Sequence, residues 1–284
     1  MLIRLGYDIE LELSIPMTVI AVLNVHPSRS RDLREPDEIQ ISPGAKSSKY
    51  LDSFGNVCTA IEAPQGPLRL SNSTLIEDSG APDPVDWNAP QLRISELPKE
   101  ALQFLLASRY CEVDRMSDIA WQLFGNTQPG WPRAQAILDW VHNHVTFGYH
   151  FARPTKTALD AYNERQGVCR DFQHLAITLT RAMHIPARYC TGYLGDIGVP
   201  PAASPMDFSA WYEVYLGDRW WALDARNHIP RIGRILMATG RDAADVAITT
   251  SFGVSWLNRF SVVTDEVVTP GTPYKTLTAN TVLS

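Results

Sequence analysis

Four cysteines are the candidate nucleophiles of this 284-residue chain, at positions 58, 111, 169 and 190. They are too few and too widely spaced for a disulfide framework or a thiolate zinc site. Cys169 opens an amphipathic segment that runs to about Met183, before Pro186, which predicts a helix with Cys169 in its first turn. The unpaired N–H groups of that turn favour a thiolate and can receive an oxyanion. We therefore predict that Cys169 is the reactive cysteine and that Cys111 and Cys190 are buried apolar residues.

A predicted β-hairpin follows this helix and carries an acidic residue near its end. Residues 207–216 alternate as a strand does, Gly217-Asp218 is a two-residue turn signal, and residues 219–226 form the expected returning strand. This register makes Ser209 and Asp224 diagonal neighbours on one face, about 7–8 Å apart at the backbone. Asp224 is thus placed where a carboxylate can orient a base.

Several short segments of the chain together resemble the core of the bacterial transglutaminase-like superfamily, which is similar in fold to the papain-like cysteine peptidases. They are Gly167-Val168-Cys169-Arg170-Asp171-Phe172, Ile185-Pro186-Ala187-Arg188-Tyr189, Gly192-Tyr193, Ala210-Trp211, Glu213-Val214-Tyr215, and the segment from Trp220 to Asp224. The resemblance covers roughly residues 100–265, and the β-rich region before it resembles the N-terminal module of bacterial members. It implies that Cys169 is the nucleophile and Asp224 the third member of a catalytic triad.

The resemblance also implies a reaction class. We expect amide-bond chemistry on a peptide or amide substrate through a thioester on Cys169, with hydrolysis favoured over crosslinking. Acyl transfer and hydrolysis share this covalent intermediate, so access of solvent decides which acceptor reacts. The sequence has no metal-ligand spacing and no phosphate-binding loop, so we expect no metal and no cofactor.

One position departs from the family pattern. The family's general base is a histidine immediately before the Ala-Trp pair, and this chain has Ser209 there. A hydroxyl cannot act as a base near neutral pH. If the returning strand continues to Pro230, His228 lies on the Asp224 face near Ser209 and could replace the missing imidazole. His174 projects about 140° from Cys169 around the helix, so we expect it on the polar side, either solvated or behind the residues that form the site.

Two alternatives need no histidine. In one, the helix end and Arg170 activate Cys169, which then works as a slow acyl-transfer or amide-cleaving site. In the other, catalysis is lost and the cleft only binds an extended peptide or acyl chain.

The elements around these residues predict an α+β fold. Residues 2–25 alternate as two strands, and short β-prone runs follow up to residue 98, which favours a β-sandwich-like N-terminal domain over residues 1–95. A proline-rich segment, residues 79–90, is expected to be a connector. Apolar spacing then predicts helices within 97–110, 116–124 and 133–144. Residues 96–284 are thus expected to form a papain-like or transglutaminase-like core whose cysteine helix packs on an antiparallel sheet.

Composition limits the partners. The formal net charge is −6 and the isoelectric point is about 5.6, so nothing favours nucleic acid or an anionic membrane surface. The apolar stretch over residues 15–25 contains Pro16 and Asn24 and is too short to span a membrane. We expect a cytoplasmic protein of unspecified oligomeric state.

Three arginines downstream have two interpretations. Arg231, Arg234 and Arg241 could receive a substrate carboxylate, but such residues more often form a solvated rim or pair with acids such as Asp242 and Asp245. We favour the second interpretation.

Overall fold

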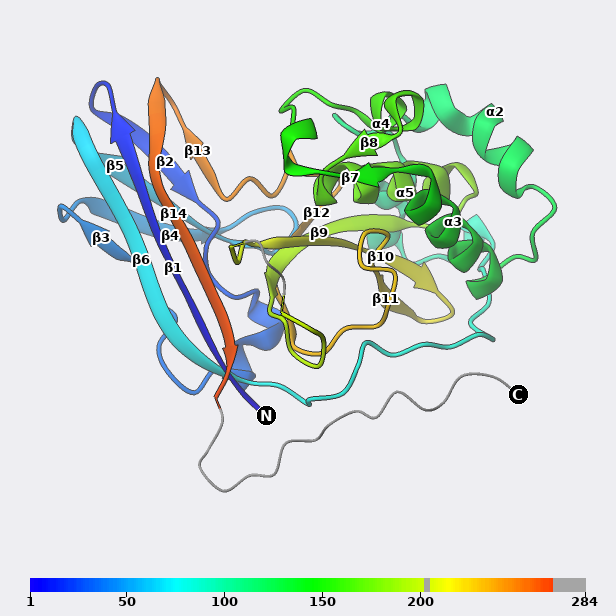
Figure 1. The fold of residues 1–284 in the computed structure, drawn as a ribbon, viewed down its shortest axis with the longest axis horizontal. Helices are drawn as coiled ribbons and strands as arrows, with labels where there is room; N and C mark the ends of the chain where they lie inside the picture. The colour runs from blue at the N-terminus through cyan, green and yellow to red at the C-terminus, as the bar shows by residue number, and fades with distance from the viewer. Residues whose placement is uncertain (202–204, 268–284) are drawn as a thin grey trace.

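A computed structural model describes residues 1–201 and 205–267. Two four-stranded antiparallel sheets form one side of the molecule (Figure 1). The first has the order β14 (Ser255–Glu266), β1 (Leu2–Leu13), β6 (Gly66–Glu77), β3 (Gln40–Ser42), and the second β13 (Thr249–Ser251), β2 (Met17–Ala21), β5 (Val57–Ala63), β4 (Lys46–Leu51).

Alternation in the first strand builds the core between these sheets. The odd-numbered side chains of β1 from Ile3 to Leu13 are buried, and they share one apolar cluster with Val19 of β2 and Ile61 of β5. The predicted β-sandwich is therefore present.

The sandwich takes strands from both ends of the chain. β14 pairs with β1 along its whole length, and β13 pairs with β2. The predicted division at residue 95 assigned residues 249–266 to the core, whereas their strands complete the N-terminal sheets. Residues 268–284 of that predicted domain lie outside the described residues.

A third antiparallel sheet and five helices form the rest of the fold. The sheet has the order β11 (Arg219–Leu223), β10 (Ser209–Leu216), β9 (Ala187–Leu194), β12 (Arg234–Gly240). The helices are α1 (Lys99–Leu102), α2 (Val113–Phe124), α3 (Trp131–His144), α4 (Ala158–Glu164) and α5 (Cys169–Ala182). Two short parallel strands, β7 (Thr146–Phe147) and β8 (Gln166–Gly167), precede α5, and short 3₁₀ helices occupy Pro27–Asp32, Ile94–Glu96, Gln103–Leu105 and Tyr149–Phe151.

The third sheet lies between the sandwich and the helices (Figure 1). Tyr193 and Ile235 point into the sandwich core, whereas Tyr189 and Tyr212 belong to the cluster that contains the helices. Helix α5 packs against α2, α3, α4 and this sheet, and every residue from Asp171 to Ala182 is buried. The expected α+β class, with a cysteine helix on an antiparallel sheet, is confirmed. No helix in the described ranges is long and apolar enough to cross a membrane.

Candidate active site

Cys169 is the first residue of α5, as predicted. The carboxylate of Asp171 accepts the N–H of Val168 at 2.9 Å and so caps the helix. Gly167 precedes this turn, and a Cβ there would approach the Asp171 side chain to 2.7 Å. The β7–β8 pair holds the same segment at Phe147 and Gly167. These contacts fix where the thiol projects.

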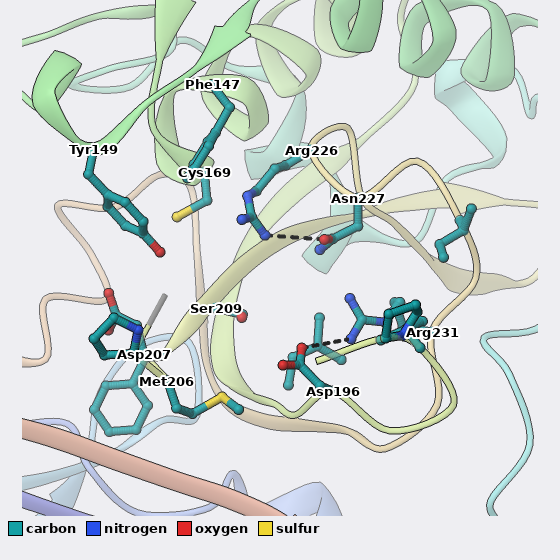
Figure 2. Close-up of a pocket in the computed structure, with 16 residues that line it drawn as sticks. Phe147, Tyr149, Cys169, Asp196, Met206, Asp207, Ser209, Arg226, Asn227 and Arg231 are labelled. Atoms are coloured by element: carbon teal, nitrogen blue, oxygen red, sulfur yellow. Dashed lines mark hydrogen bonds and ion pairs between the residues drawn. The ribbon is translucent and has the colours of Figure 1, made fainter. Parts of the chain in front are cut away.

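The thiol faces a cavity of about 330 Å³. Apolar side chains form much of its lining, and a polar set completes it (Figure 2). That polar set is Tyr149, Cys169, Asp196, Asp207, Ser209, Arg226, Asn227 and Arg231.

Of the four cysteines, Cys169 is the one that lines this cavity, and it is half-buried. Cys58, Cys111 and Cys190 are buried, and burial raises the pKa of Cys111 to about 11 and that of Cys190 well above its ordinary value. The expectation that Cys111 and Cys190 are apolar core residues is confirmed.

The pKa of Cys169 is shifted in the direction opposite to the one expected for a thiolate. Burial raises the pKa of its thiol to about 11, the nearby Arg226 cation opposes this rise, and Asp207 and Asp224 add to it. The expectation of a lowered pKa is wrong, because burial among carboxylates outweighs the helix end.

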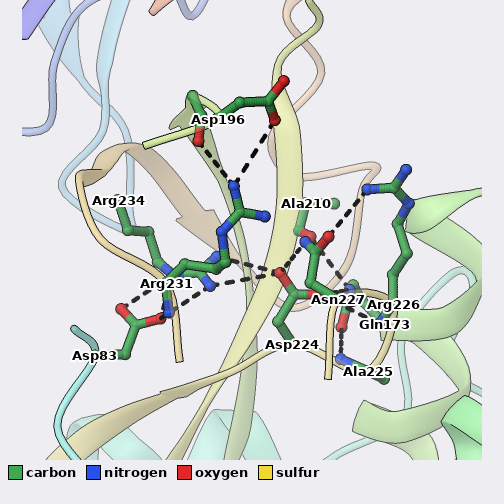
Figure 3. A network of polar contacts seen from close by, with 11 residues as sticks. Asp83, Gln173, Asp196, Ala210, Asp224, Ala225, Arg226, Asn227, Arg231 and Arg234 are labelled. Atoms are coloured by element: carbon green, nitrogen blue, oxygen red, sulfur yellow. Dashed lines mark hydrogen bonds and ion pairs between the residues drawn. The ribbon is translucent and has the colours of Figure 1, made fainter. Parts of the chain in front are cut away.

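Asp224 is buried, 4 % exposed, with its carboxylate surrounded by protein donors (Figure 3). Oδ1 accepts the side-chain amide of Gln173 at 3.1 Å and the backbone N–H groups of Arg226 and Asn227 at 3.1 and 3.0 Å. Oδ2 accepts the Asn227 amide at 2.8 Å and a longer contact from Arg234 at 3.4 Å. Both carboxylate oxygens of Asp224 therefore already accept hydrogen bonds, and none of these donors is an imidazole.

Gln173 joins the elements of the site. It lies one turn after Cys169 on α5, fully buried, and donates to the carbonyl of Ala210 at 3.2 Å as well as to Asp224. Its oxygen accepts the N–H of Ala225 at 3.3 Å. Sequence reasoning missed this residue, although its i+4 spacing from Cys169 places it on nearly the same helix face.

The hairpin register is correct as far as the ladder runs. Tyr212 pairs with Leu223 and Leu216 with Arg219 across the Gly217-Asp218 turn. The returning strand then stops at Leu223, because Gln173 accepts the N–H of Ala225 and the Asp224 side chain accepts those of Arg226 and Asn227, which folds the chain into a tight turn.

Because the strand ends at Leu223, the predicted position of the His228 ring, beside Ser209 and Asp224, is wrong. His228 has a positive φ of 61°, and its Nε2 contacts a carboxylate oxygen of Asp139 at 2.7 Å rather than Asp207 or Asp224. Its ring stacks on His142 with centroids 4.3 Å apart. Its neighbours Asn227 and Ile229 line the cavity, but His228 does not.

Of the two positions expected for His174, the solvated one is wrong. This residue is fully buried, its Nε2 accepts the N–H of Ala243 at 3.1 Å, and its ring stacks on Tyr110. Burial holds the pKa of His174 well below its ordinary value. No histidine in the described parts of the chain lines the cavity.

Two of the three downstream arginines, Arg231 and Arg234, make polar contacts with residues around the site. Arg234 is buried, and although burial opposes its charge, Asp83 and Asp224 outweigh this effect and raise its pKa. Arg231 donates to the carbonyl of Gly195 at 2.8 Å, while Arg241 pairs with Asp245 at 2.9 Å as expected.

The comparisons with known proteins agree with this architecture. Residues 118–225 match the transglutaminase-like superfamily, a span that contains both Cys169 and Asp224. The chain therefore carries a transglutaminase-like core.

Similar proteins cover most of the chain. The crystal structure of a candidate cysteine protease from Cytophaga hutchinsonii superposes with a TM-score of 0.82 and 28% identity, over 96% of this chain and 93% of its own. An uncharacterized protein of Mycobacterium leprae is 28% identical over 230 residues, which are 74% of this chain and 77% of that protein. An uncharacterized protein of Mycobacterium tuberculosis is 26% identical over 226 residues, which are 71% of this chain and 70% of that protein.

Proposed function

We propose that this chain is a cysteine-dependent acyl-transfer enzyme that cleaves an amide or ester bond through a thioester on Cys169, with water as the main acceptor. The observation that carries the proposal is the thiol itself, at the first turn of α5 and facing the cavity. Its position in a transglutaminase-like core, and the likeness to a candidate cysteine protease over nearly the whole chain, support the same chemistry.

The reaction has two steps. In the first, the thiolate sulfur adds to the carbonyl carbon, the bond from that carbon to nitrogen or oxygen breaks, and the leaving amine or alcohol takes a proton from water. In the second, water adds to the thioester, which releases the acid and restores the thiol. The thiol loses its proton to solvent before the first step, since no imidazole lines the cavity in the described residues.

The absent imidazole sets the expected rate. With a thiol pKa of about 11, only a small fraction of Cys169 is thiolate at neutral pH. Below that pKa the thiolate fraction grows about tenfold for each pH unit. We expect slow hydrolysis of activated esters that accelerates steeply between pH 7 and pH 10.

A steady-state assay with a p-nitrophenyl ester tests this proposal. The wild-type rate should follow the thiolate fraction, and Cys169→Ala should remove the enzymatic rate at every pH. Cys111→Ala, which removes a thiol buried outside the cavity, is the matched control and should hydrolyse the ester as the wild type does. Equal rates for wild type and Cys169→Ala would overturn the proposal.

A second candidate is a binding site without turnover, for peptide or acyl chains. The specific observation in its favour is that Asn227, Gln173 and Arg234 already occupy the Asp224 carboxylate. Saturable binding of a peptide together with no ester hydrolysis at pH 10 would establish this candidate and exclude the first.

A further inference from the structure

The cavity holds one arginine whose charge is not paired by a carboxylate. The guanidinium of Arg226 donates to the side-chain oxygen of Asn227 at 3.2 Å and lies 4.3 Å from the ring centroid of Phe147. Within residues 1–201 and 205–267 it forms no salt bridge, in contrast to Arg231 and Arg234. A half-buried cation without a counter-ion attracts an anion strongly.

The protein holds this cation in place before any ligand arrives. Asn227 donates its amide to Asp224 at 2.8 Å, which leaves its oxygen turned toward Arg226. Asp224 also accepts the backbone N–H of Arg226 at 3.1 Å. The chain of contacts from Asp224 through Asn227 therefore fixes the guanidinium beside the cavity (Figures 2 and 3).

A second arginine lies beside the same cavity. Arg231 is 7 % exposed and lines the cavity, and its Nε is buried without a hydrogen-bond partner in the described structure. Ser209, on the cavity wall, has a small side chain where the family pattern has an imidazole, so the space in front of Arg226 is not filled from that position.

We propose that Arg226 binds a carboxylate of the ligand within reach of the Cys169 thiol, so that the substrate is an acyl donor with an acidic group close to its reacting carbonyl. The proposal rests on the proposed function for the role of the bound molecule as a substrate. The carboxylate site itself needs no turnover.

Two alkylating reagents of nearly equal size test the site. Iodoacetate carries a carboxylate and transfers a carboxymethyl group to the thiolate sulfur with loss of iodide, whereas iodoacetamide is neutral and transfers a carbamoylmethyl group in the same way. The readout is the ratio of their rates at Cys169, measured by peptide mass spectrometry. Any change in thiol pKa alters both rates alike and cancels in the ratio.

We expect Arg226→Gln to lower the ratio of the iodoacetate rate to the iodoacetamide rate by about tenfold. Arg226→Lys should retain part of the preference. Arg115→Gln removes an equal charge from the exposed face of α2 and should leave the ratio at the wild-type value. An unchanged ratio in Arg226→Gln, with an unchanged melting temperature, would overturn the proposal.

Competition then identifies the source of the carboxylate. N-acetyl-dialanine presents a chain-terminal carboxylate, and N-acetyl-aspartyl-alaninamide presents an acidic side chain. Saturable protection of Cys169 from iodoacetamide by the first assigns the site to a peptide end, and by the second to an acidic residue. Protection by neither, or equal protection by N-acetyl-dialaninamide, would contradict carboxylate recognition.

Failure of this site and failure of the proposed function are distinguishable. A charge-dependent alkylation ratio without ester hydrolysis would leave a carboxylate-binding cavity and refute the enzyme. Ester hydrolysis that depends on Cys169 but shows no charge dependence would refute the Arg226 site alone.

Discussion

At the residue scale, the charge around one sulfur atom governs the chemistry. Burial raises the pKa of Cys169 to about 11, and Arg226 is the cation that works against it. Asp207 lines the same cavity and acts in the opposite direction, and partial desolvation raises the pKa of its own carboxyl. The pocket therefore favours the thiol form in the free protein, and its reactivity should respond to single charge changes.

Asp207→Asn should make Cys169 more reactive. A negative charge at position 207 favours the protonated thiol, so removing it lowers the pKa of Cys169 and increases the thiolate fraction at pH 8. We expect alkylation of Cys169 by iodoacetamide at pH 8 to accelerate about threefold or more. Asp218→Asn, in the exposed hairpin turn, is the control. A slower rate in Asp207→Asn would mean that the carboxylate acts as a base.

At the element scale, the turn after β11 is the feature that replaces the family's arrangement. Asp224 binds Asn227 and two backbone N–H groups, so a carboxylate that would orient an imidazole holds a turn instead. Position 209 is a serine, and Asp224 is occupied by protein donors. Restoring a base then requires that both positions change.

Ser209→His combined with Asn227→Ala should restore general-base catalysis. Removing the Asn227 amide leaves Oδ2 of Asp224 with only the longer Arg234 contacts, so an imidazole at position 209 could then bind that oxygen. We expect ester acylation of Cys169 at pH 7 to rise by at least about tenfold in the double variant, the lower end of what a positioned base supplies. Each single variant should change the rate little. A double variant no faster than Ser209→His alone would contradict this account of the turn.

The sequence predicts helices and strands well, but it predicts poorly the turns that side-chain hydrogen bonds stabilise. The two-residue hairpin loop fixes the pairing of Tyr212 with Leu223, and helical spacing places Cys169 at the start of α5. The alternating pattern beyond Asp224 also looks like a strand, but side-chain hydrogen bonds end it and turn His228 toward Asp139. Such bonds depend on partners distant in sequence, among them Gln173.

Periodicity fails for His174 for a different reason. A helix covered on one side leaves its polar face in solvent, whereas α5 is covered by α2, α3, α4 and the sheet. The polar side of its sequence pattern is therefore buried as well. The sequence pattern carries no information on how many neighbours surround a helix.

At the scale of the whole molecule, strands from both ends of the described chain pair in one sandwich, and the third sheet packs against it. β12 and β9 present Ile235 and Tyr193 to the sandwich core, and Phe208, which lines the cavity, belongs to the same apolar cluster. The segment predicted as a connector also contributes, because Asp83 accepts the N–H of Arg231 at 2.9 Å and pairs with Arg234 at 3.0 Å. The site depends on residues from every part of the described chain.

Removal of β13 and β14 should destabilise the entire protein. These strands cover one edge of each N-terminal sheet, and β14 supplies the buried Val262. Relative to a chain that ends at residue 267, we expect a chain that ends at residue 248 to melt at least about 10 °C lower or to aggregate through the exposed edges. Calorimetry and light scattering measure both outcomes. An unchanged melting temperature would show that the sandwich does not need the C-terminal strands.

Trapping of the acyl-enzyme is the most direct test that Cys169 forms a thioester with the substrate. The protein is mixed with an activated ester at pH 9, quenched in acid, and analysed by intact and peptide mass spectrometry. We expect a single acyl group on Cys169 that disappears on incubation in buffer as the thioester hydrolyses, and no such group in Cys169→Ala. Acylation that maps to another residue, or none on Cys169 while the ester is still hydrolysed, would contradict this expectation.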